Sequence, residues 1–148
     1  MHDNLRTTQM VHLGNLALSG TTPAASAWVD LKGYDETSIV MVNNTVTDAG
    51  TAAGFTASAQ YGDDTTAAGA AAIGTDDSVD GSTITIAVTS DTADNAVAGA
   101  IGYVGNARYL RLNVVGTTGT DADVSVYAVL GGAHRRPTTF IGTSVAAT

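Results

Sequence analysis

The chain has 148 residues, of which 44% are hydrophobic and 14% are charged, so it is long enough for one domain with a buried core. Its formal net charge of −8 disfavours nucleic acid as a partner, and the absence of cysteine excludes disulfides and thiolate chemistry. No apolar run approaches the ~20 residues that cross a bilayer, and the N-terminus lacks signal-peptide features, so we expect cytoplasmic synthesis and no membrane partner.

Alternation of apolar and polar residues predicts strands rather than helices along most of the chain. In chain order, the expected strands are 11–18, 27–31, 37–43, 54–61, 83–89, 98–103, 108–115 and 123–130. Gly- and Asp-rich steps between these runs favour tight turns, and the alanine-rich stretch 67–72 fits either a helical turn or a loop. Strands at this spacing predict an all-β fold, an antiparallel β-sandwich or a barrel.

The same alternation predicts which side chains form the core. The run 37–43 is apolar at successive positions, so we expect it to be buried on both faces. The residues expected to be largely buried are Ile39, Val40, Val42, Phe55, Ile84, Ile86, Leu110, Leu112, Val126 and Leu130.

No set of residues predicts catalysis or a cofactor. The three histidines stand in unrelated contexts and no serine lies in a Gly-x-Ser-x-Gly elbow, so we expect no enzymatic activity. The segment 76–81 matches the opening of a calcium loop, but the twelfth position, which should be a bidentate glutamate, is Ala87. We therefore interpret 76–81 as an acidic turn that needs no calcium.

The arginines are placed in two pairs. Arg108 and Arg111 flank Tyr109, and Arg135 and Arg136 are adjacent near the C-terminus. The planar guanidinium suits bidentate carboxylate pairs at protein contacts, although solvated charges would explain the same pattern. Because Arg108 and Arg111 are three positions apart, we expect them on opposite faces of a strand, one bracing the fold and the other facing a partner.

Three segments of the chain carry a resemblance. The segment Ala-Trp-Val-Asp-Leu-Lys-Gly-Tyr occupies 27–34, and Gly-Tyr-Val-Gly-Asn-Ala-Arg-Tyr-Leu-Arg-Leu occupies 102–112, followed by Leu-Gly-Gly-Ala-His-Arg-Arg-Pro at 130–137. These segments resemble a family of small tailed-bacteriophage proteins whose genes typically lie beside that of the major capsid protein. The chain departs from the family over 48–80, and His134 lies later than the histidine of the family's Leu-Gly-His step.

The resemblance implies a structural virion protein, made in the host cytoplasm, that decorates and cements a capsid by binding the outer surface of the major capsid protein lattice. It implies a jelly-roll-like β-sandwich, often trimeric, without a cofactor. The residues expected at capsid or subunit contacts are Arg108, Tyr109, Arg111, His134, Arg135, Arg136 and Phe140. Two alternatives are a virion-displayed module that binds the host or glycans, and a head-completion or connector component.

The two ends of the chain lack the alternation that would place them in the sandwich. We expect an N-terminal arm at 1–10, the sandwich at 11–136 and a C-terminal arm at 137–148. Phe140 and Ile141 would gain from burial, so we expect one or both arms to dock on a neighbouring subunit or on the capsid.

Overall fold

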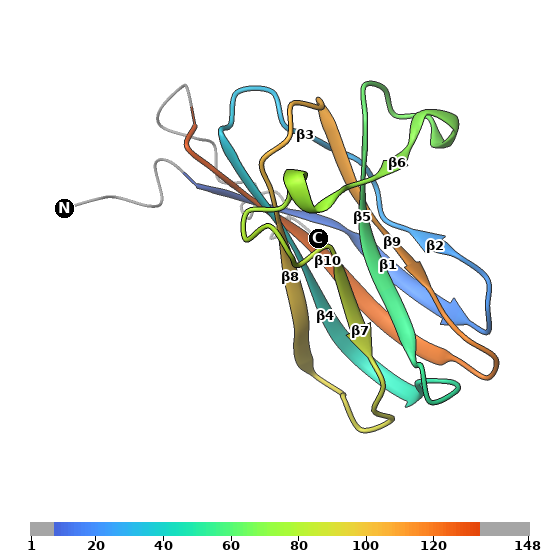
Figure 1. Cartoon of the computed structure of the whole chain (residues 1–148). Coiled ribbons are helices and arrows are strands. Elements are labelled where there is room, and N and C mark those ends of the chain that lie inside the picture. Colours follow the sequence, from blue (N-terminus) through green and yellow to red (C-terminus); the bar gives the residue numbers. More distant parts are fainter. Residues whose placement is uncertain (1–7, 134–148) are drawn as a thin grey trace, which may run out of the picture.

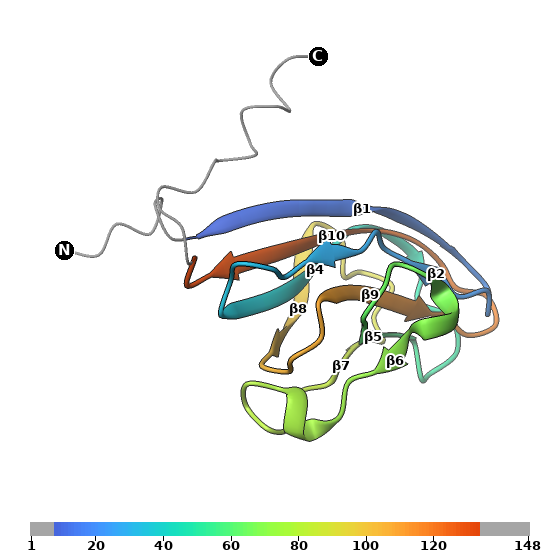
Figure 2. The same ribbon diagram turned by 90° about the horizontal axis from the view of Figure 1, so that it is seen from above.

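The computed structural model describes residues 8–133, which form two antiparallel β-sheets packed face to face (Figures 1 and 2). The strands are β1 (Gln9–Ser19), β2 (Ala24–Ala25), β3 (Val29–Asp30), β4 (Glu36–Asp48), β5 (Phe55–Gly62), β6 (Ala71–Ala72), β7 (Thr85–Val88), β8 (Ala96–Tyr103), β9 (Tyr109–Val115) and β10 (Asp121–Gly131). Two single turns of 3-10 helix, η2 (Ala67–Gly69) and η3 (Thr75–Asp77), flank β6. No helix within 8–133 is long and apolar enough to cross a membrane.

The strands pair in a nested order. The first sheet has the order β1-β10-β4-β8. In the second sheet, β2 and β3 pair with one edge of β9, β9 pairs with β5, and β6 and β7 pair with β5. The first strand therefore pairs with the last, β4 with β8 and β5 with β7, as in a long hairpin rolled into two layers. This is the arrangement of a jelly roll, so the predicted all-β sandwich is confirmed.

Side chains at alternate strand positions fill the space between the sheets. Leu110 and Leu112 of β9 meet Ile39 and Met41 of β4 in one core, and all four are fully buried. The predicted burial is confirmed for Ile39, Phe55, Ile86, Leu110, Leu112, Val126 and Leu130.

Three of the predicted core residues are only partly buried. Ile84 precedes β7 and packs at the margin of the core. Val40 and Val42 alternate with Ile39 and Met41, so they lie on the outer side of the first sheet. The expectation that 37–43 is buried on both faces is wrong, because the fold has two layers and the second sheet covers only one face of β4.

Several boundaries differ from those expected. β1 begins at Gln9, so residues 9 and 10 belong to the sheet rather than to an N-terminal arm. The alanine-rich stretch 67–72 contains both the single turn η2 and the short strand β6. The segments 1–7 and 134–148 lie outside the described residues, and with them the predicted contact residues His134, Arg135, Arg136 and Phe140.

Candidate functional site

Two of the three segments that carry the sequence resemblance meet in the second sheet, where 27–34 contributes β3 and 102–112 contributes most of β9. β3 pairs with β9, with Val29 opposite Leu110 and Asp30 opposite Tyr109. The amide of Leu31 donates to the carbonyl of Arg108 at 2.8 Å, which extends the pairing by one step. The surface formed by Trp28, Asp30, Arg108, Tyr109 and Arg111 is called the motif surface below.

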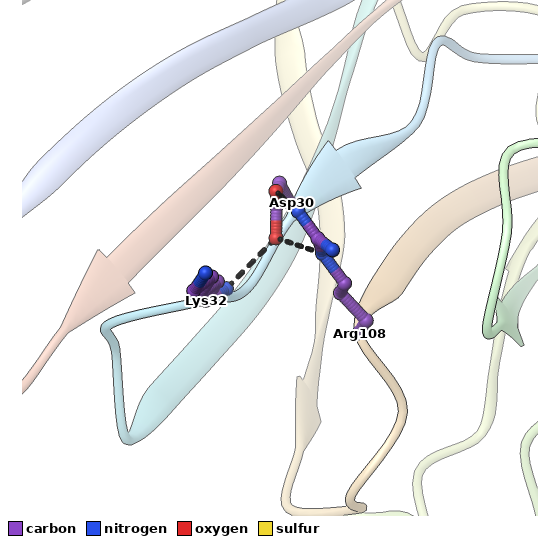
Figure 3. A network of polar contacts seen from close by, with 3 residues as sticks. All are labelled: Asp30, Lys32 and Arg108. Carbon is purple, nitrogen blue, oxygen red and sulfur yellow. Dashed lines mark hydrogen bonds and ion pairs between the residues drawn. The ribbon is translucent and has the colours of Figure 1, made fainter.

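Arg108 is held by an acidic partner within the chain (Figure 3). Its terminal nitrogen lies 2.9 Å from one carboxylate oxygen of Asp30, and its Nε lies 3.3 Å from the other. The amide of Lys32 also donates to Asp30, at 2.9 Å. The hydrogen bond from Arg108 lowers the pKa of Asp30. Since both side chains are about half exposed, this pair orients the guanidinium more than it stabilises the fold.

Arg111 is fixed without an acidic partner. Its guanidinium carbon lies 4.6 Å from the centre of the Trp28 ring, a cation–π contact, and its Nε donates to Oε1 of Gln60 at 2.9 Å. Gln60 is the cross-strand neighbour of Arg111 on β5. Within residues 8–133, neither terminal nitrogen of Arg111 has a hydrogen-bond acceptor. The side chain therefore presents oriented, unpaired donors that match the two oxygens of a carboxylate.

The arginines do not divide between the two faces of a strand as expected. β9 begins at Tyr109, so Arg108 precedes the alternating positions and is exposed beside Asp30. Arg111 and Tyr109 lie on the outer face, while Leu110 points inward. Both arginines therefore belong to the motif surface, together with Tyr109. Trp28 and Asp30, which complete it, stand in the resemblance segment at 27–34 but were not predicted as contact residues.

The glycines of the Gly-Tyr-x-Gly segment are explained by close packing. A Cβ on Gly102 would lie 2.6 Å from Val79, and one on Gly105 would overlap the Tyr103 hydroxyl. That hydroxyl accepts a hydrogen bond from the amide of Ala107 at 3.1 Å, and burial raises the pKa of Tyr103. Neither glycine has a positive φ, so close packing rather than a left-handed backbone accounts for both glycines.

A cleft of about 310 Å³ lies beside the motif surface. Its lining includes Lys32, Tyr34, Asp35, Tyr103 and Arg108, so it combines cationic, acidic and phenolic groups. No group of three or more His, Asp or Glu side chains that could hold a metal occurs in the part of the chain that the structure describes.

The outer side of the first sheet carries a different kind of surface. Met10, Val40, Val42, Tyr127 and Val129 line a shallow groove of about 230 Å³. These residues form the apolar face. The apolar side chains of Val40 and Val42 led to the prediction that both residues are buried. Alternation in the sequence does not show whether a second layer covers the face on which they lie.

The 76–81 segment is organised around one carboxylate. Asp80 accepts hydrogen bonds from the amides of Ser82 and Thr83 and from the hydroxyls of Ser78 and Thr83, at 2.5 to 3.0 Å. The hydrogen bond from the Thr83 hydroxyl is the main cause that lowers the pKa of Asp80. The carboxylate oxygens of Asp80 thus bind donors of their own turn. That this turn needs no calcium stays a prediction.

Replacing Asp80 by asparagine is expected to lower the free energy of unfolding at neutral pH. The variant's free energy of unfolding should also change less as the solution is acidified. Because the folded-state pKa lies below 3.8, the contribution of this carboxylate is complete above that pH and is lost as the pH falls further. Urea unfolding from neutral pH to about pH 3 should show the two proteins converging. Asp76→Asn, which removes an equal charge outside these hydrogen bonds, is the control; an equal effect would contradict the prediction.

The fold defines a class: a jelly-roll sandwich, here with a polar, arginine-bearing outer face on one sheet and an apolar groove on the other. No protein-family model matches the chain, and no curated protein sequence matches it. Among solved structures, it is similar to PBSX exported protein XepA, with 14% identity and a TM-score of 0.53 over 88% of this chain. The chain spans 39% of the length of XepA.

Two further structures are similar at a lower score. The SPBc2 prophage-derived protein YomS shares 12% identity, with a TM-score of 0.48 over 83% of this chain and 91% of its own. PirA shares 13% identity, with a TM-score of 0.45 over 78% of this chain and 91% of its own. At such identities the likeness to XepA shows a common fold.

Proposed function

We propose that this protein is a structural protein of a bacteriophage virion that decorates and stabilises the capsid by binding the outer surface of the major capsid protein lattice. The proposal is supported by the resemblance of 27–34 and 102–112 to the phage family. These two segments are distant in sequence, yet they form one continuous surface through the pairing of β3 with β9. Side chains on that surface are directed away from the core, so packing does not account for them.

The observation that carries the proposal is the state of Arg111. A guanidinium stacked on Trp28, with Nε already bonded to Gln60, loses little conformational freedom when it binds. Its terminal nitrogens, which have no acceptor within residues 8–133, suit a carboxylate from a protein partner, and the sheet face offers area for a broad contact rather than an enclosed pocket. Lattice binding repeated over many symmetric copies would need only modest affinity at each contact.

The test uses capsids of the phage that encodes the chain, freed of this protein and then mixed with the purified full-length chain. Cosedimentation should show saturable binding, with many copies per capsid. Arg111→Gln should weaken binding about tenfold, since it removes a charged partner from a contact that excludes water. Lys32→Gln is the matched control, because it removes the same charge from the rim of the neighbouring cleft.

Three outcomes would contradict the proposal, and a fourth would contradict the role given to Arg111. Absence of binding to the capsid would exclude a decoration role. Binding of the purified chain to glycans with no capsid present would favour the host- or glycan-binding alternative. A copy number as small as that of a ring would favour a head-completion or connector component. Equal losses for Arg111→Gln and Lys32→Gln would show that net charge, not the oriented guanidinium, governs attachment.

A further inference from the structure

The apolar face is continuous across three strands of the first sheet. Met10 of β1 is paired with Val129 of β10, and Tyr127 of β10 is paired with Val40 of β4. Val42 lies two positions further along β4, on the same side. Met10 is 54% exposed, and the other four are partly exposed. The groove that these five side chains line has no polar surface.

Such a face is unusual for the outside of a sandwich. An antiparallel sheet with one wet side normally turns polar residues toward water. The second sheet follows this rule, since its outer positions include Ser58, Gln60, Arg111 and Asn113. Contiguous apolar surface on one side only is typical of a protein contact.

Hydroxyl and amide side chains that can each donate and accept lie beside the apolar face. Ser125 lies between two asparagines: its hydroxyl is 2.7 Å from Asn15 Oδ1, and the amide nitrogen of Asn44 donates to it at 2.7 Å. The Tyr127 ring is supported by His12, with ring centres 5.0 Å apart. A large aromatic side chain held in place at the middle of a face is a common anchor of protein interfaces.

We propose that the apolar face is the contact surface of a homodimer, in which two copies of the chain pack sheet to sheet about a twofold axis. In a twofold interface the same residues meet on both sides, so the surface must be complementary to itself. Apolar side chains satisfy this condition at any position, and amides and hydroxyls satisfy it because each can both donate and accept.

The charges of the chain support a second copy as the occupant. The net charge of −8 makes most approaches between two copies repulsive. The five residues of the apolar face are uncharged, and exposed carboxylates stand at the two ends of this side, Glu36 on β4 at one end and Asp121 and Asp123 on β10 at the other. A twofold axis in the plane of the interface, whether along or across the strands, brings the carboxylate-bearing ends of the two copies together. Added salt screens the repulsion between these carboxylates, so it should strengthen the dimer.

The available area comes close to that of a specific dimer interface. β1 and β10 each have 11 residues. At about 3.3 Å per residue and about 4.8 Å between strands, the four-stranded face measures roughly 35 Å by 15 to 20 Å, on the order of 600 Å². Specific interfaces bury about 800 Å² on each partner, so the face and its rim supply most of what a dimer requires.

The test is sedimentation equilibrium of the full-length chain over a range of concentrations, without any partner. We expect a monomer–dimer equilibrium that salt shifts toward the dimer. Met10→Glu and Val42→Glu should each weaken dimerisation at least about tenfold, because each would bury a pair of like charges. Thr56→Glu, at an exposed outer position of the second sheet, is the matched control and should leave the dimer intact.

A monomer at every concentration, a trimer, or a dimer unaffected by both variants would overturn the inference. So would a dimer that salt dissociates. Met10 projects from the sheet surface, so loss of the fold does not complicate its variant, and unfolding curves can verify this for Val42→Glu. The inference is independent of capsid binding: the dimer is measured in its absence, and failure of either proposal leaves the other standing.

Discussion

Replacing Gly54 by alanine is expected to lower the free energy of unfolding by about 2 to 5 kcal/mol. Gly54 has φ of +66°, a left-handed conformation that costs a non-glycine residue about 1 to 2 kcal/mol. A Cβ at this position would also overlap the carbonyl of Val88, on the strand that pairs with β5, so backbone would have to move. Urea unfolding followed by circular dichroism measures the loss.

Gly81 provides a matched control for this prediction. Its φ of +68° is nearly the same, but a Cβ there would have no atom within 4 Å. Gly81→Ala should therefore show only the backbone cost, about 1 to 2 kcal/mol. If the two variants lost equal stability, the close approach of Val88 to Gly54 would not contribute.

Truncating Leu112 to alanine is expected to cost about 2 to 5 kcal/mol. Leu112 is fully buried in the middle of β9, and both of its backbone groups bond to Ser26: the amide donates to the Ser26 hydroxyl, and the carbonyl accepts from the Ser26 amide. These bonds hold the strand in place, so the side-chain cavity cannot close easily. The same urea titrations at neutral pH measure the effect.

Val115 on the same strand is the comparison for Leu112. It points away from the core and is 37% exposed, so Val115→Ala should change stability by less than about 1 kcal/mol. A loss below about 0.5 kcal/mol for Leu112→Ala would mean that the packing between the sheets differs from that described.

The two proposed contacts should respond to salt in opposite directions. The second sheet presents Arg111 with unpaired donors, so its contacts with a carboxylate should weaken as salt rises. The first sheet presents Met10, Val40 and Tyr127, and its contact should strengthen with salt. Opposite salt dependences for capsid attachment and for dimerisation would therefore identify which face serves which contact.

The sequence by itself determined the strands and most of the core. Alternation in segments such as 108–115 and 123–130 identified β9 and β10 within two residues at each end, because each strand has one inner and one outer side. The same rule placed Phe55, Leu110 and Leu112 in the core. It failed for Val40 and Val42, since hydrophobicity does not show how many layers a fold has.

Only the tertiary structure decided which residues form a surface together. The pairing of β3 with β9 joins Asp30 to Arg108 across 78 positions, and Arg111 meets Gln60 across 51. Nested pairing brings the first strand beside the last, which places Met10 next to Val129. Periodicity is a local property of the chain, whereas these contacts depend on strand order and register, which emerge when both sheets bury their inner faces against each other.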